Sequence, residues 1–225
     1  MTTTTAPLAT LDQSLGALAR SIPGATRVFN EHALDFCCGG KHSLRAAAAE
    51  RGLDANAIAE QLAALQPEPD VQDWQQASDE ELISHIMARF HAVHREQLPE
   101  LIRLARRVET VHGEDRPECP LGLADHLEHM LQEMESHMQK EEQVLFPMLL
   151  RGMRPMAGGP IAVMRHEHDE HGVALQRLAL LTNDITLPRG ACNTWRALYV
   201  GLRAFREDLM EHIHLENNLL FERTA

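Results

Sequence analysis

A His-x-x-x-Glu pair occurs twice in the second half of this chain, as His137–Glu141 and as His212–Glu216. A spacing of four places both side chains of a pair on one face of an α-helix, about one turn apart. Each pair can therefore direct an imidazole and a carboxylate at one point. Because the pairs lie on two different amphipathic segments, they predict a carboxylate-bridged site for two metal ions inside a helical bundle.

Four long amphipathic segments predict an all-α fold for this half of the chain. They cover about residues 78–112, 121–151, 160–183 and 193–222. The first opens with a capping-box pattern from Ser78 to Glu81, and Pro160 suits the first turn of the third. Short connections containing Gly and Pro favour antiparallel neighbours, which gives an up-down-up-down four-helix bundle. We find no alternation of period two that would indicate a strand.

A proline-containing stretch, Pro67 to Asp70, separates this bundle from the N-terminal part. We expect a disordered tail over residues 1–11, a small helical domain over 12–66, a linker over 67–77 and the bundle over 78–225. The stretch from Ser14 to Arg20 suits a short helix, Ser43 and Asp54 are placed to cap two further helices of the small domain, and Pro23 is placed to open another. The Cys-Cys-Gly-Gly segment within 35–43 predicts an exposed turn.

Composition excludes several classes of function. The formal net charge of −12 argues against a nucleic-acid surface, and no apolar run approaches the length of a membrane span. The first residues lack the pattern of a secretory signal, and four cysteines without such a signal indicate free thiols in the cytoplasm. The 14 histidines are an excess that metal binding would explain.

The candidate ligands fall at one level of the expected bundle. Measured from the approximate helix ends, they lie within roughly two turns of each other in antiparallel helices. The second helix also carries a 3-4 stripe that faces the core and includes Glu133, Val144 and Met148, and the fourth carries one from Leu198 to Leu219. A glutamate in such a stripe is unfavourable unless it is paired or binds a cation, and two of them at matching height favour a shared cation. The candidates are His91, His137, Glu141, His168, His212 and Glu216.

Two of these positions have competitors on nearly the same helix face. His94 competes with His91, and His171 competes with His168, whereas His166 points away and is expected to be exposed. We expect the remaining histidines to be surface residues or neighbours of the ligands; they are His85, His112, His126, His129 and His214. Four imidazoles and two carboxylates without a thiolate suit iron, manganese or zinc, and we favour iron. Cys119 and Cys192 receive no role.

Five motifs in order resemble the hemerythrin-like HHE family, and more closely its iron–sulfur cluster repair di-iron proteins of the ScdA/YtfE, or RIC, type. The motifs are HALDFCCGGK, RFHAVHREQLPEL, SHMQKEEQVLFPM, EHDEHG and DLMEHIHLENNLLF. Together they extend over nearly the whole chain. The chain departs from the family only at its end, where no proline follows Phe221.

The resemblance implies a role for each matching residue. It assigns the six candidates above as ligands of two non-haem iron ions, with Glu141 and Glu216 as bridges and an oxo bridge between the ions. Glu133 and Glu167 match acidic positions near the site, where they would line a route for iron or ligand. Cys37 and Cys38 match the N-terminal thiol pair of the family.

The function implied is repair of iron–sulfur clusters damaged by oxidative or nitrosative stress, with the protein as iron donor or redox partner. Damaged or apo iron–sulfur proteins would be its partners. Two alternatives remain: a hemerythrin-type module that binds or senses oxygen or nitric oxide, and an enzyme that reduces nitric oxide at the two metals. The sequence does not decide whether the chain is an enzyme or whether two chains pair.

Overall fold

The computed structural model describes residues 8–37, 40–66 and 73–223. Within these ranges the regular structure is helical, and the one β-type pairing is an isolated bridge between Ser14 and Ser43. The predicted all-α class is thus confirmed. Among the described helices, none combines the length and the apolar character that crossing a membrane requires.

The chain divides into two compact units, which are described separately. One comprises Met1–Ser78 with Met210–Arg223, and the other comprises Asp79–Leu209 with Thr224–Ala225. Helix α11 (Asn193–His214) runs without interruption past Leu209, so its last turn is counted with the first unit although it continues a helix of the second.

The N-terminal part of the first unit contains five short helices: α1 (Leu8–Asp12), α2 (Leu15–Ser21), α3 (Ala25–Glu31), α4 (Leu44–Glu50) and α5 (Ala55–Ala63). The predicted caps at Ser43 and Asp54 are confirmed, because their side chains accept hydrogen bonds from backbone amides of the first turns, and Ser14 caps α2 in the same way. Such caps satisfy amide groups that have no partner within the helix. The small core includes Phe29 and Phe36, both fully buried.

Two expectations for this part were wrong. Residues 8–11 do not belong to a disordered tail, because they form most of α1 and Leu11 is buried. Pro23 does not open a helix either. Gly24, with φ of 83°, precedes α3 and supplies a left-handed turn that an L-residue rarely adopts. Residues 1–7 and most of the expected linker, 67–72, lie outside the described ranges.

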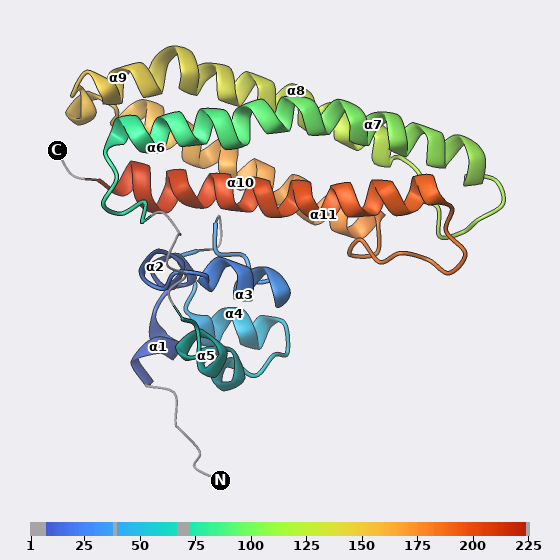
Figure 1. Ribbon diagram of the computed structural model, residues 1–225, viewed down its shortest axis with the longest axis horizontal. Helices are drawn as coiled ribbons and strands as arrows, with labels where there is room; N and C mark the ends of the chain where they lie inside the picture. Colours follow the sequence, from blue (N-terminus) through green and yellow to red (C-terminus); the bar gives the residue numbers. More distant parts are fainter. Residues whose placement is uncertain (1–7, 38–39, 67–72, 224–225) are drawn as a thin grey trace, which may run out of the picture. The chain divides into compact units, whose positions relative to one another are not determined.

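The predicted antiparallel helices begin in the second unit, and the last of them ends in residues that are counted with the first (Figure 1). The first consists of α6 (Asp79–Ile86), η1 (Met87–His91) and α7 (Ala92–His112). The second consists of α8 (Leu123–Lys140), η2 (Glu141–Leu145) and α9 (Phe146–Leu150), followed by a short turn, η3 (Arg154–Met156). The third is α10 (Gly158–Leu181), and the fourth begins as α11 and continues as η4 (Leu215–Leu219) and η5 (Leu220–Glu222). Pro99 lies inside α7 without ending it.

The stripe predicted on the fourth helix is confirmed, since its members from Leu198 to Leu219 are all buried. The stripe on the second helix is only partly correct. Val144 is 49% exposed, whereas Leu145, Phe146 and Leu149 are buried instead. The cause is η2, a π-helical segment that adds a residue to one turn and so rotates the following side chains around the helix.

Candidate metal centre

Three of the four long helices change to π-helix where the candidate ligands lie. His91 is the last residue of η1, Glu141 is the first residue of η2, and Glu216 lies in η4. Single π-helical turns inside α-helices are frequent at functional sites, because the wider turn redirects a side chain that an α-helix would place elsewhere. In this protein the redirected side chains belong to the predicted ligand set.

All six predicted ligands are brought together. Their ligand atoms form two groups of four residues, within each of which every atom lies within 4.8 Å of the others. Glu141 and Glu216 belong to both groups and are fully buried. The first group adds His91 and His212, and the second adds His137 and His168.

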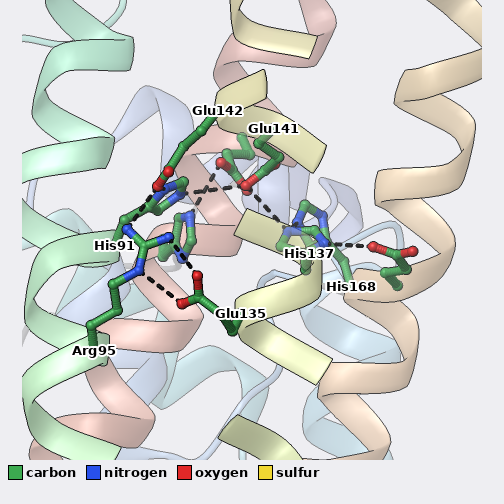
Figure 2. Close-up of polar contacts among 10 residues, drawn as sticks. His91, Arg95, Glu135, His137, Glu141, Glu142 and His168 are labelled. Atoms are coloured by element: carbon green, nitrogen blue, oxygen red, sulfur yellow. Dashed lines mark hydrogen bonds and ion pairs between the residues drawn. The ribbon is translucent and has the colours of Figure 1, made fainter. Parts of the chain in front are cut away.

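The distances around Glu141 show how one carboxylate serves both groups. Its Oε2 atom lies 3.4 Å from Nε2 of His91 and 3.4 Å from Nε2 of His137 (Figure 2). Nε2 of His137 is also 3.1 Å from Nε2 of His168. On the fourth helix, Nε2 of His212 lies 3.1 Å from Oε1 of Glu216. In this arrangement the carboxylate of Glu141 faces two positions, each with its own imidazoles.

A network of charged side chains orients His91. Its Nδ1 atom lies 2.8 Å from Oε1 of Glu142, which also accepts a hydrogen bond from Arg95 (Figure 2). Arg95 in turn binds both carboxylate oxygens of Glu135. Burial opposes ionisation of Glu142, but hydrogen bonds from Arg95 and His91 outweigh burial and lower the pKa of this carboxyl. Glu142 is therefore an ionised acceptor, and Nδ1 of His91 must donate.

A second carboxylate, that of Glu167, orients His137. Nδ1 of His137 lies 2.9 Å from Oε2 of Glu167, whose other oxygen accepts from Lys140. The hydrogen bond from His137, opposed by burial and reinforced by Lys140, lowers the pKa of Glu167 to about 2. Glu167 was predicted to line a route to the site, and its contact with His137 is an orienting one in addition.

These hydrogen bonds allow a test of whether the residues fit a metal. With the proton of each imidazole on Nδ1, the Nε2 lone pairs of His91 and His137 face the oxygen of Glu141. Lone pairs that face each other in a buried site repel, and two buried carboxylates without a cation are unfavourable. Cations between these atoms would satisfy them, and the mixed imidazole and carboxylate donors suit iron. The residues fit the two-iron group.

The competing histidines are buried but belong to neither group. His94 is fully buried with its ring against Phe205 at a centroid distance of 5.7 Å, and His171 packs edge-on against His137 at 5.1 Å. The exposure predicted for His166 is confirmed. His126 and His214 are not surface residues, because both are buried. Burial lowers the pKa of His214 to about 4, and its Nδ1 atom contacts the amide of Asn218.

The prediction that the Cys-Cys pair is exposed is wrong for Cys37. Cys37 is buried, not exposed, since it packs in the small unit and its Sγ donates to Oδ1 of Asp35 at 3.3 Å. Its carbonyl also accepts from the side chain of Asn217 at 3.4 Å. Cys38 lies outside the described residues. Gly40 permits the tight approach in this segment, because a Cβ there would lie 2.5 Å from the carbonyl oxygen of Phe36.

Two residues near the site were missed by sequence reasoning: Glu142 and Arg95. Glu142 directly follows the candidate ligand Glu141, and no spacing in the sequence pointed to it as a contact of His91. The π-helical turn at η2 brings it toward His91. Arg95 lies four residues after His91, a spacing that could have indicated a common face.

The comparisons with known proteins agree with this geometry. Residues 82–224 match the family model described as Hemerythrin HHE cation binding domain. Residues 11–66 match a second model, described as Domain of Unknown function (DUF542). The chain therefore belongs to the hemerythrin HHE cation-binding family, the class that its helical bundle and its histidine and glutamate groups define.

Similar proteins indicate which members of this family the chain resembles. The iron-sulfur cluster repair protein YtfE of Yersinia pseudotuberculosis serotype O:1b (strain IP 31758) is 58% identical over 213 residues, which cover 94% of this chain and 96% of the relative. The protein of the same name from Yersinia pestis (strain Pestoides F) shows the same identity and coverage. The resemblance to the iron–sulfur cluster repair proteins is confirmed.

Proposed function

We propose that this protein holds two iron ions and takes part in the repair of damaged iron–sulfur clusters. The observation that carries the proposal is the pair of buried four-residue groups that share Glu141 and Glu216. Likeness to relatives named iron-sulfur cluster repair proteins over nearly the whole chain supports the biological role. Its partners would be damaged or apo iron–sulfur proteins of the cytoplasm, the compartment in which free thiols persist.

Each ligand has a specific role in this proposal. His91 and His212 would hold one ion, His137 and His168 would hold the other, and the two glutamates would bridge them. Bound iron would supply one-electron redox chemistry and a reserve of metal, and an oxo bridge would complete the resting centre. Glu142 and Glu167 keep the imidazoles in the tautomer that presents Nε2.

A pocket between α8 and α10 supports a path for iron. It has a volume of about 250 Å³, and its lining includes Glu133, Glu167 and Glu170. Glu167 also contacts the ligand His137, so the pocket reaches the immediate surroundings of the site. Carboxylates along this path would attract a divalent cation, and Lys140 at its wall would offset part of that attraction. Cys37 and Cys38 remain the proposed thiols of the function.

Metal analysis of protein purified without a metal-binding tag tests this proposal first. We expect about two irons per chain, with a near-ultraviolet band that dithionite bleaches. Zinc or a single iron that persists after anaerobic reconstitution would contradict the two-iron centre.

Transfer of iron to an apo-ferredoxin then tests the repair role. The reduced protein should restore the cluster of the ferredoxin, and Glu216→Leu should fail to do so. Glu128→Leu, which changes an exposed carboxylate paired with Arg106, is the matched control and should act normally. If the wild-type protein keeps both irons beside the apo-ferredoxin, iron donation is wrong. Reversible binding of oxygen or nitric oxide would then identify a binding module.

A further inference from the structure

A cysteine and a histidine meet at the opposite end of the bundle from the metal ligands. Sγ of Cys192 lies 3.2 Å from Nε2 of His112. His112 is the last residue of α7, and Cys192 directly precedes α11. Each is about 20 residues from a ligand on its own helix, which corresponds to roughly 30 Å. This pair is therefore separate from the centre described above.

The two helix ends favour opposite charges on the two side chains. The C-terminal end of a helix stabilises a cation and the N-terminal end stabilises an anion. His112 lies at the C-terminal end of α7, and Cys192 accepts the first helical hydrogen bond of α11 from the amide of Arg196. Transfer of a proton from the thiol to the imidazole places each charge at the helix end that stabilises it.

Two arginines hydrogen-bond the backbone segment that leads into Cys192 and bring positive charge to it. Arg116 donates to the carbonyl of Arg189 at 2.8 Å, and Arg196 donates through Nε to the carbonyl of Ala191 at 3.2 Å. Glu118, 3.4 Å from Nε of Arg116, offsets part of this charge. Both Cys192 and His112 are half-buried, so a small reagent can reach them.

Packing holds the imidazole in place. The ring of His112 lies against the buried ring of Trp195, at a centroid distance of 5.3 Å and an interplanar angle of 35°. A second cysteine in this unit, Cys119, shows the contrast. It is buried, and its Sγ donates to the carbonyl of Val108 at 3.8 Å. Burial, followed by the nearby charge of Glu109, raises the pKa of the Cys119 thiol.

We infer that Cys192 and His112 form a reactive thiol site that small hydroperoxides oxidise. His112 takes the thiol proton on Nε2, and the sulfur attacks the outer oxygen of the hydroperoxide. The S–O bond forms as the O–O bond breaks. The sulfur loses two electrons and becomes a sulfenic acid, while the hydroperoxide is reduced to an alcohol whose oxygen receives the proton from His112.

The test is site-resolved oxidation of the iron-loaded, full-length protein with tert-butyl hydroperoxide. Sulfenic acid is trapped with dimedone, and the modified residue is identified by peptide mass spectrometry. We expect the adduct on Cys192 and not on Cys119, and none at this position in Cys192→Ser. His112→Gln keeps a hydrogen-bonding side chain but cannot take the proton, so it should slow the reaction by about tenfold or more. His166→Gln, on an exposed histidine, is the matched control and should react as the wild type does.

Oxidation by radicals from the iron centre would not depend on His112. Equal rates in wild type and His112→Gln would therefore overturn the inference, as would an adduct on Cys119 that forms as fast as the one on Cys192. If His112→Gln fails to fold, alkylation of the wild-type protein by iodoacetamide provides the second measurement. Cys192 should react faster at neutral pH than a cysteine in an unstructured peptide. A slower reaction would exclude an activated thiol.

Discussion

Two regions of the bundle can be compared: the ligand level, where Glu141 and Glu216 lie, and the far end, where His112 and Cys192 lie. The same long helices build both regions but by different means. At the far end, buried apolar residues such as Leu127, Leu178 and Leu198 lie in regular α-helix. At the ligand level, buried imidazoles and carboxylates coincide with π-helical turns in three helices. The same stripe spacing thus produces an apolar core in one place and a cation site in the other.

The difference shows where each region obtains its stability. The far end is stabilised by removal of apolar surface from water, which needs no ligand. The ligand level buries two carboxylates, whose desolvation is offset only when cations lie between them. A metal-free bundle should therefore be held together mainly by its far end.

Substitution at the shared carboxylate should have the largest effect on metal binding. Glu141→Leu removes a member of both groups, so we expect iron affinity to fall by about 100-fold or more. The metal-free variant should be more stable than the metal-free wild type by about 1–4 kcal/mol, because a buried charge is replaced by an apolar group. Metal analysis and urea unfolding measure the two effects. Unchanged iron content would remove Glu141 from the ligand set.

A cavity at the far end should produce the opposite result. Leu198→Ala removes a fully buried side chain and should lower the free energy of unfolding by about 2–5 kcal/mol. Iron per chain should stay at the wild-type value, since no candidate ligand lies at this level. Urea unfolding of the metal-free protein, together with metal analysis, checks both statements. Loss of iron in this variant would show that the two levels are not independent.

Acid should weaken the ligand level through Glu167. Its pKa is lowered from 4.5 to about 2 in the folded chain, so its stabilising effect is complete above pH 4.5 and disappears as the pH falls toward 2. The contribution is on the order of 1–2 kcal/mol after allowance for solvent screening.

Unfolding of metal-free Glu167→Gln at neutral and acid pH measures this effect. The variant should lose less stability on acidification than the wild type, whereas Glu170→Gln, on an exposed carboxylate, should match the wild type. An equal loss in all three proteins would mean that the contact with His137 does not stabilise the fold.

Much of this fold could be read from local patterns in the chain. The helix caps at Ser43 and Asp54, the four long helices and the two His-x-x-x-Glu pairs depend on residues within a few positions of each other. The choice between His91 and His94 could not be made in this way, because both lie on nearly one face. Packing between helices distinguishes the two, since η1 turns His91 toward Glu141 while His94 lies against Phe205.

The sequence by itself determined the helical periodicity. It also determined the two pairs in which a histidine and a glutamate lie one helical turn apart. These follow from spacing along a helix, which is a local property. The tertiary structure alone decided the π-helical turns, the orienting contacts of Glu142 and Glu167, and the meeting of Cys192 with His112. The contacts among these features join residues 30 to 80 positions apart. They depend on how helices pack against each other, and no local pattern specifies that packing.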